Sequence, residues 1–318
     1  MTLTFDACVT DIVCDAFGPA FASGDGTVAW ADGERISAHE GAILCAAAHP
    51  SGDGVITGGD DGRLVWSRRG GAHELAALEN RWIDAVAVSP VSGLIAFASG
   101  RDARVLDVKD AGFERRFSHA ASVAALAFDP KGRRLAAATY GGAALWYARI
   151  AEQTPVMLRW AGSHIAAAFS PDGKFLISSM QEGALHGWRL SDAMDMRMGG
   201  YPAKVRSLVF IAKGAWLATS GAQGAVLWPF GGGGGPMGKQ AMELGYDQTA
   251  MVTRVAGDPA TSVFCAGLDD GRVWVCDLEN QAVTPVKSER GAPISALAMT
   301  RADIAWGDDA GCAGMVAR

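Results

Sequence analysis

The sequence predicts an all-β fold in which small antiparallel sheets form a ring, the architecture called a β-propeller. Three observations lead to it: an apolar, weakly charged composition, a repeat of about 40 residues, and four short strands per repeat. The chain has 318 residues, of which 49% are hydrophobic and 19% charged. That composition is too apolar for a disordered chain. We therefore expect one domain that spans residues 1–318.

The repeat has two recognisable halves. The first is an apolar run that ends in a turn, at 43–50 (ILCAAAHP), 83–90, 123–130, 164–171, 205–212, 252–259 and 294–301. The second is a strand of small residues, a turn rich in Gly and Asp, and a strand that ends on a large residue, as in 58–66 (GGDDGRLVW). The eight copies of this half end at Trp30, Trp66, Val108, Trp146, Trp188, Trp228, Cys276 and Val316. They predict eight four-stranded blades.

The two terminal repeats are incomplete in complementary ways. The inner strand of the first copy has to be taken from 12–17, and no residues follow Arg318 to form a fourth strand in the last copy. If the segment from Thr2 to Cys8 supplies that strand, the N-terminal and C-terminal strands pair and the ring closes. Closure is favoured because it removes unpaired sheet edges. Seven blades, with one terminal copy degenerate, is the alternative.

Two stretches carry a family resemblance, 170–190 (SPDGKFLISSMQEGALHGWRL) and 267–278 (GLDDGRVWVCDL). They resemble the WD40 repeat family, whose members often place Gly-His before the first strand. In that family the His joins a hydrogen-bonded network with a turn Asp, a Ser or Thr and a Trp. The resemblance implies such a network from His39, Thr57, Asp61 and Trp66. It also implies that the fold serves as a scaffold for protein or peptide partners.

Composition excludes several classes of function. The formal net charge of −6 argues against non-specific nucleic-acid binding, which needs a basic surface. No apolar run approaches the length of a membrane span, and the N-terminus lacks the features of an export signal. The six cysteines form no C-x-x-C pair, which favours reduced thiols over a zinc site. We expect a cytoplasmic protein that binds neither nucleic acid nor membrane.

Three motifs could suggest chemistry, and each has a simpler interpretation. The spacing of Gly233, Gly238 and Lys239 imitates a phosphate-binding loop, but Gln240 stands where Ser or Thr would ligate Mg²⁺. The acidic pairs at 60–61, 269–270 and 308–309 fall in predicted turns, where Asp is a turn former. The histidines are scattered, and no nucleophile or metal motif accompanies them. We therefore predict no enzyme activity, no catalytic residue, no metal and no cofactor.

A binding surface is the function that the sequence favours. The connections that enter the inner strands should lie on one rim, at Asp11, Ala42, Trp82, Ser122, Ser163, Lys204, Met251 and Pro293. Trp, Tyr and Arg residues, which are common in interfaces, gather around the third to sixth of these positions. The candidate rim residues are Arg81, Trp82, Tyr140, Arg159, Trp160, Tyr201, Lys204 and Arg206. We expect Trp82 and Trp160 to anchor a peptide, and Arg81, Lys204 and Arg206 to favour an acidic one.

Two other functions remain open at this stage. The fold could be a propeller hydrolase or lactonase with a metal in its central channel, or a structural subunit of a larger assembly. Bound metal after purification would favour the first, and poor solubility of the isolated chain the second. The sequence leaves open whether the propeller is a monomer or part of a complex.

Overall fold

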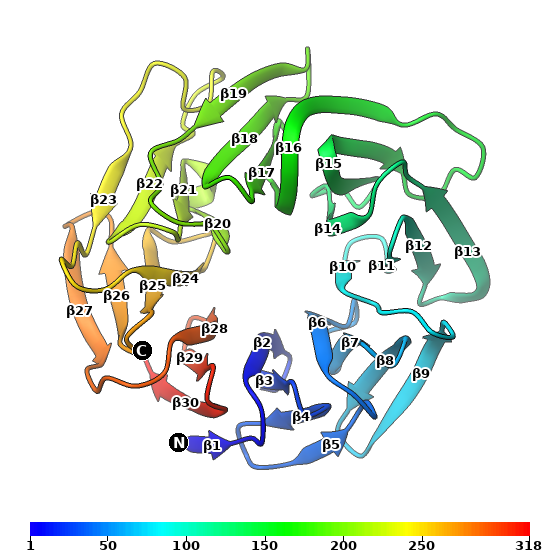
Figure 1. Ribbon diagram of the computed structural model, residues 1–318, viewed down its shortest axis with the longest axis horizontal. Helices are drawn as coiled ribbons and strands as arrows, with labels where there is room; N and C mark the ends of the chain where they lie inside the picture. Colours follow the sequence, from blue (N-terminus) through cyan, green and yellow to red (C-terminus); the bar gives the residue numbers. More distant parts are fainter.

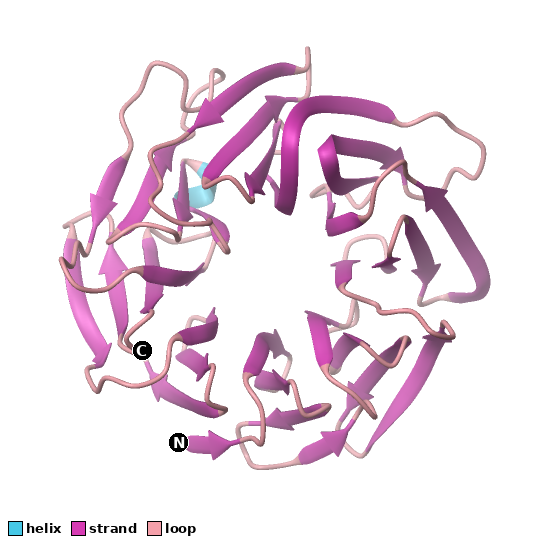
Figure 2. Cartoon of the chain, in the orientation of Figure 1, coloured by secondary structure: helices cyan, strands magenta, loops and turns pink.

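The computed structural model describes all residues, 1–318, as a ring of antiparallel sheets around a central opening (Figure 1). The ring is built almost entirely from strands, as Figure 2 shows. Its one helical element is the 3₁₀ turn η1 (Ala212–Gly214), and no helix is long and apolar enough to cross a membrane. The all-β prediction is confirmed.

Each four-stranded sheet starts with an inner strand at the opening and runs outward (Figure 1). The first three sheets are β2 (Val9–Asp15), β3 (Gly18–Ser23), β4 (Thr27–Trp30) and β5 (Arg35–Ser37); β6 (Ile43–Ala48), β7 (Val55–Gly59), β8 (Arg63–Arg68) and β9 (Gly71–Ala77); and β10 (Ala85–Ser89), β11 (Leu94–Ser99), β12 (Asp102–Asp107) and β13 (Asp110–Ser118). The fourth sheet has six strands, β14 (Val123–Phe128), β15 (Arg134–Tyr147), β16 (Val156–Phe169), β17 (Phe175–Met180), β18 (Ala184–Arg189) and β19 (Met194–Met198).

The remaining three sheets again have four strands each. They are β20 (Leu208–Ile211), β21 (Trp216–Thr219), β22 (Ala225–Pro229) and β23 (Met242–Leu244); β24 (Val252–Gly257), β25 (Val263–Leu268), β26 (Val273–Asp277) and β27 (Ala282–Lys287); and β28 (Ile294–Met299), β29 (Asp303–Asp308), β30 (Cys312–Ala317) and β1 (Thr2–Thr4).

The prediction of eight separate four-stranded blades is wrong. The backbone hydrogen bonds define seven sheets, which is the alternative number. Two predicted repeats, with second halves at 139–146 and 179–188, share the six-stranded sheet. They merge because β16 is a continuous strand of 14 residues that pairs with β15 near Val156 and with β17 near Phe169. No loop interrupts β16 to separate the two repeats.

The hydrophobic core lies between neighbouring sheets. One cluster joins Ala96 of β11 to Trp146 of β15, and another joins Ala218 of β21 to Phe264 of β25. The sheets approach closely, which explains the small residues of the repeat. A Cβ on Gly58 would lie 2.5 Å from Cγ2 of Ile83, which lies in the connection that enters the next sheet. The Gly and Ala runs in the second strands are thus a packing requirement.

The two chain ends meet in one sheet. β1 is its outer strand and pairs antiparallel with β30, with Leu3 opposite Ala313. The strand covers only part of the 2–8 segment that was expected to contribute here. Beyond it, Phe5 is buried in the core that this sheet shares with the β2–β5 sheet. The ring is therefore continuous around the opening, with the two termini side by side (Figure 1).

Candidate interaction surface

A buried histidine network supports the rim between β5 and β6. His39 is 4% exposed, and its Nδ1 lies 2.9 Å from Asp61 Oδ1 while its Nε2 lies 2.8 Å from Thr57 Oγ1. Asp61 Oδ1 also accepts the Arg63 N–H at 3.0 Å. Although burial raises the pKa of the Asp61 carboxyl, the hydrogen bond from His39 and the others outweigh it and lower that pKa. The network ties the rim connection to the β7–β8 turn.

The structure leaves Trp66 out of this network, which corrects the set implied by the family resemblance. The Trp66 Nε1–H donates to Asp53 O at 2.7 Å. Its ring stacks on His49, with centroids 4.3 Å apart. Trp66 opposes His73 in β9, and its indole nitrogen is directed toward the turn that precedes β7, away from Thr57. His39, Thr57 and Asp61 are therefore the members that the structure brings together.

Tyr201, a predicted rim contact, belongs to an equivalent network. Its hydroxyl lies 2.7 Å from Thr219 Oγ1 and accepts the Trp228 Nε1–H at 2.6 Å. Thr219 Oγ1 in turn donates to Val226 O. Burial raises the pKa of the Tyr201 hydroxyl to about 12. Tyr201 is half-buried, so its main role is to hold the rim rather than to present a free ring.

Trp160, the second predicted anchor, also packs inward. Its ring stacks on His186 with centroids 3.9 Å apart and an interplanar angle of 16°. The carbonyl of Trp160 lies 3.1 Å from His164 Nε2. That Trp160 anchors a ligand stays a prediction, and one face of its ring is already covered by His186.

The other candidate residues are exposed. Trp82 is 64% exposed and Tyr140 is 70% exposed. The four cations Arg81, Arg159, Lys204 and Arg206 are exposed as well. The rim position assigned to Asp11 is corrected to Cys8, since β2 begins at Val9 rather than at residue 12. Asp11 instead lies on the inner strand, where burial raises the pKa of its carboxyl to about 6.

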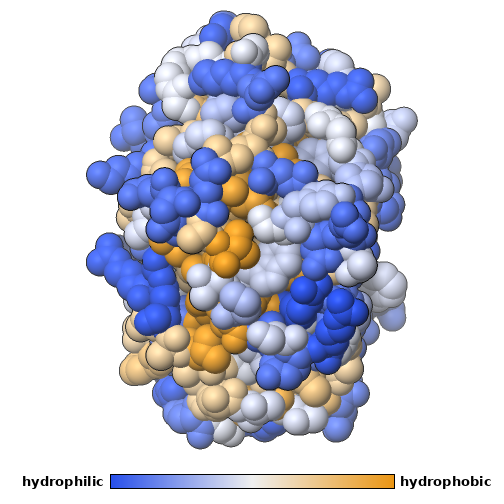
Figure 3. Space-filling model, turned by 90° about the vertical axis from the view of Figure 1, so that its left-hand side faces the viewer, coloured by the Kyte–Doolittle hydropathy of each residue, from blue (hydrophilic) through white to orange (hydrophobic).

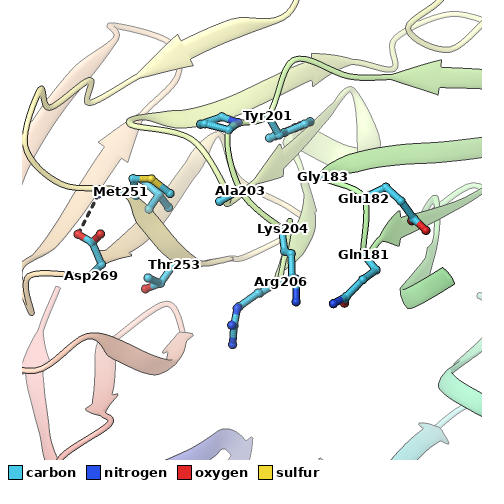
Figure 4. Close-up of a pocket in the computed structure, with 13 residues that line it drawn as sticks. Gln181, Glu182, Gly183, Tyr201, Ala203, Lys204, Arg206, Met251, Thr253 and Asp269 are labelled. Atoms are coloured by element: carbon cyan, nitrogen blue, oxygen red, sulfur yellow. Dashed lines mark hydrogen bonds between the residues drawn. The ribbon is translucent and has the colours of Figure 1, made fainter. Parts of the chain in front are cut away.

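A cavity of about 630 Å³ opens on the rim between β20 and β24, and we call it the Lys204 cavity. Figure 4 shows Lys204, Arg206 and Gln181 extending in the same direction, toward the centre of the ring. Tyr201 forms part of its wall. The cavity thus unites three of the predicted residues and adds Gln181 and Asp269, for which the sequence gave no signal beyond their place in predicted turns.

In the Lys204 cavity the carboxylates accept hydrogen bonds from the protein, whereas the two cations form no ion pair. Asp269 Oδ1 accepts the Met251 N–H at 2.9 Å, and Glu182 Oε1 accepts the Ser163 N–H at 3.2 Å. Lys204 and Arg206, by contrast, form no ion pair. Behind them, burial and then repulsion from Arg206 lower the pKa of the Arg254 guanidinium. The free donors of the cavity are therefore cationic, while its carboxylates are held by backbone N–H groups.

The comparisons with known proteins bear on this architecture. Residues 33–66 match the WD40 family model, described as WD domain, G-beta repeat. This stretch contains the whole His39 network, and it lies in a ring of antiparallel sheets. The chain is a β-propeller, and its residues 33–66 form a WD40-type repeat. Among solved structures, it is similar to the crystal structure of the computationally designed Ika8 protein, with a TM-score of 0.80 and 19% identity over 99% of this chain and 98% of that one. That likeness concerns the fold alone, and no curated protein matches the chain.

The remaining sequence motifs have structural roles in this propeller. The glycine-rich stretch 230–240 joins β22 to β23, where Lys239 Nζ donates to Gly231 O. Asp270 and Asp308 accept turn N–H groups, as expected of turn residues. No group of three or more His, Cys, Asp and Glu side chains is placed to hold a metal ion.

The outer side of the propeller is a less suitable binding surface. Figure 3 looks at the left-hand side of Figure 1, where β23 and β27 form the edge, and shows apolar residues gathered between hydrophilic ones. Val283 of β27 is an exposed hydrophobic there. The same edge strand contains Pro285 and Lys287, which oppose pairing with another strand. The rim is therefore the better candidate for an interaction surface.

Proposed function

We propose that this WD40-type propeller is a non-catalytic scaffold that binds an acidic peptide segment of a protein partner in the Lys204 cavity. The observation that carries the proposal is the pair of exposed cations, Lys204 and Arg206, which line one cavity and form no ion pair. WD40 propellers typically bind proteins, which fits this reading of the rim.

The chemistry of the cavity favours a carboxylate ligand. An acidic side chain that enters beside Lys204 and Arg206 gains charge-assisted hydrogen bonds without breaking an existing ion pair. Gln181 offers an amide beside them. Across the opening, the 64% exposed ring of Trp82 is a second contact for the same segment. Large exposed aromatic residues and arginines are the residue types that most often dominate binding energy.

Charge removal at the cavity tests this function. We expect the Lys204→Ala/Arg206→Ala variant to bind a pool of fluorescent acidic peptides about tenfold more weakly, a loss of about 1.4 kcal/mol. Fluorescence anisotropy with acidic, neutral and basic pools measures the effect. The matched control is Lys131→Ala/Arg133→Ala, which removes two exposed cations from the β14–β15 turn on the opposite rim. Equal binding by both variants, or a preference for the basic pool, contradicts the proposal.

Two further parts of the proposal concern the cellular compartment and the lack of a catalytic metal. All six cysteines are free, which supports a reducing compartment and hence the cytoplasm. The protein is proposed to be non-catalytic, so it should purify without stoichiometric metal. Metal analysis of the purified protein checks this, and a full equivalent of tightly bound metal would favour the hydrolase alternative.

A further inference from the structure

A second cationic cavity lies on the rim at the β10–β13 sheet, beside β12 and β13. It has a volume of about 330 Å³ and is lined by Arg81, Arg101, Asp102, Arg116, Ser118 and His119. We call it the Arg101 cavity. A neighbouring cavity of about 380 Å³ contains Trp82 and shares Arg81 with it. The two cavities therefore form one continuous surface with three guanidiniums on one side and an exposed indole on the other.

The charges of the Arg101 cavity do not balance. Asp102 is the one carboxylate, and its Oδ2 lies 2.6 Å from Arg116 Nη2 and 3.8 Å from Arg81 Nη1. Its Oδ1 accepts the Ser118 hydroxyl at 2.7 Å. Arg101 forms no ion pair. Within the Arg101 cavity three guanidiniums thus face one carboxylate that is already engaged, which leaves an excess of two positive charges there. Asp84 adds a second carboxylate to the neighbouring cavity, beside Trp82.

The histidine beside these arginines adds no charge. His119 Nε2 accepts the Trp146 Nε1–H at 2.9 Å, so this ring nitrogen carries no proton. Burial lowers the pKa of the His119 imidazole, although its contact with Arg101 O opposes the shift. His119 is therefore neutral, and the charge that faces a ligand comes from the arginines alone.

The backbone at Arg101 is held in place before any ligand arrives. The carbonyl of Arg101 accepts the His119 N–H at 2.9 Å, and the His119 ring Nδ1 lies 3.1 Å from it. The carbonyl of Gly100, one residue earlier, accepts the Val123 N–H at 2.8 Å. Only the guanidinium of Arg101 has to be ordered on binding, and preorganisation of this kind reduces the entropic cost.

We propose that the Arg101 cavity binds a phosphate monoester, with the group that carries the phosphate packed against Trp82. A dianion neutralises the excess of two positive charges, whereas a single carboxylate neutralises half of it. Guanidinium groups match phosphate oxygens through paired N–H donors. The exposed indole next to them suits a planar or apolar substituent. The Arg101 cavity shares no lining residue with the Lys204 cavity. Trp82 is a contact in both proposals, so the arginine variants and the Lys204→Ala/Arg206→Ala variant are the ones that test them separately.

Phosphorus-31 NMR titration tests the site with three probes, inorganic phosphate, phenyl phosphate and adenosine monophosphate. We expect the wild-type protein to bind all three, and the Arg101→Ala/Arg116→Ala variant to bind them at least about tenfold more weakly. Trp82→Ala should weaken phenyl phosphate and leave inorganic phosphate unchanged. Arg133→Ala, an exposed arginine on the opposite rim, is the matched control. Melting curves should coincide, because Arg101 and Arg116 are exposed.

Competing outcomes are separable. Binding of benzoate as tight as that of phenyl phosphate would overturn the preference for a dianion. Equal broadening of the phosphate signals by wild type and the double arginine variant would overturn the site itself. Among supporting results, tighter binding of adenosine monophosphate than of phenyl phosphate identifies a nucleotide as the source of the phosphate. The reverse order identifies a phosphorylated side chain.

Discussion

One position of the repeat decides which rim residues are free to bind. It lies four residues before the buried residue that opens the apolar run of each repeat, which is Val9, Ile43, Ile83, Val123, His164, Val205, Val252 or Ile294. The residues at this position are Phe5, His39, Glu79, His119, Trp160, Tyr201, Gln248 and Arg290. His39, His119 and Tyr201 bond into the sheet at this position, and Trp160 packs on His186. Trp160 and Tyr201 resemble interface aromatics by composition, yet their spacing from His164 and Val205 marks them as structural.

The His39 network gives a prediction at the same scale. We expect His39→Ala to lower the free energy of unfolding by about 2–3 kcal/mol, because it removes the buried hydrogen bonds of the ring to Thr57 and Asp61 and leaves a cavity. His73→Ala, at an exposed position of β9, should change it by less than about 0.5 kcal/mol. Urea unfolding of both variants provides the comparison, and indistinguishable midpoints would refute the structural role of His39.

At the scale of the strand, five inner strands and β16 share an irregularity. In β2, β6, β14, β16, β24 and β28 the register with the second strand shifts just after the first paired residue. Such a bulge re-aims the following side chains. In β24 it places Thr253 Oγ1 2.7 Å from Ile294 O of the neighbouring sheet. If inward and outward residues are assigned from the sequence by strict alternation, the residues at this end of these strands are therefore assigned to the wrong face of the sheet.

The turn between the second and third strands is equally constrained. Gly62 has a φ of +79°, and a Cβ there would collide with Leu78 O and lie 2.6 Å from Arg81 O. We expect Gly62→Ala to destabilise the fold by about 1–3 kcal/mol from its backbone conformation alone. The control is Gly71→Ala, where nothing lies within 4 Å of a Cβ. Thermal unfolding distinguishes the two variants. An unchanged melting temperature for Gly62→Ala would show that the rim connection at Leu78 and Arg81 can move away from the added Cβ.

At the scale of the whole molecule, closure of the ring rests on three residues of β1. The N–H of Phe5 donates to Gly311 O and the N–H of Met315 to Met1 O, so by antiparallel alternation Leu3 is the bonded residue between them. We expect Leu3→Pro to cost about 1–2 kcal/mol and to promote association through the freed edge of β30. Thr2→Pro, whose N–H faces away from β30, should behave as wild type. Size-exclusion chromatography and urea unfolding measure both effects, and identical behaviour of the two variants would exclude a closing role for β1.

The architecture was predictable because the same pattern of small and large residues recurs in each repeat along the whole chain. Small residues in the second strands, such as Gly58 under Ile83, are visible in the sequence and report close sheet packing. The number of sheets was not predictable, because it depends on whether β16 continues without a break. The Lys204 and Arg101 cavities were only partly predictable. Their arginines and lysine stand out in the sequence, but which of them lack an ion-pair partner depends on contacts between strands far apart in the chain.

The pairing of β1 with β30 also has a consequence for biosynthesis. β1 ends at Thr4 and its partner strand begins at Cys312, so almost the entire chain must be translated between them. At about 5–20 residues per second, the first strand leaves the ribosome roughly 15–60 s before the last one exists. Throughout that interval both flanks of the growing ring expose strand edges. The ring can therefore be sealed only after β30 has been translated, whichever sheet forms first.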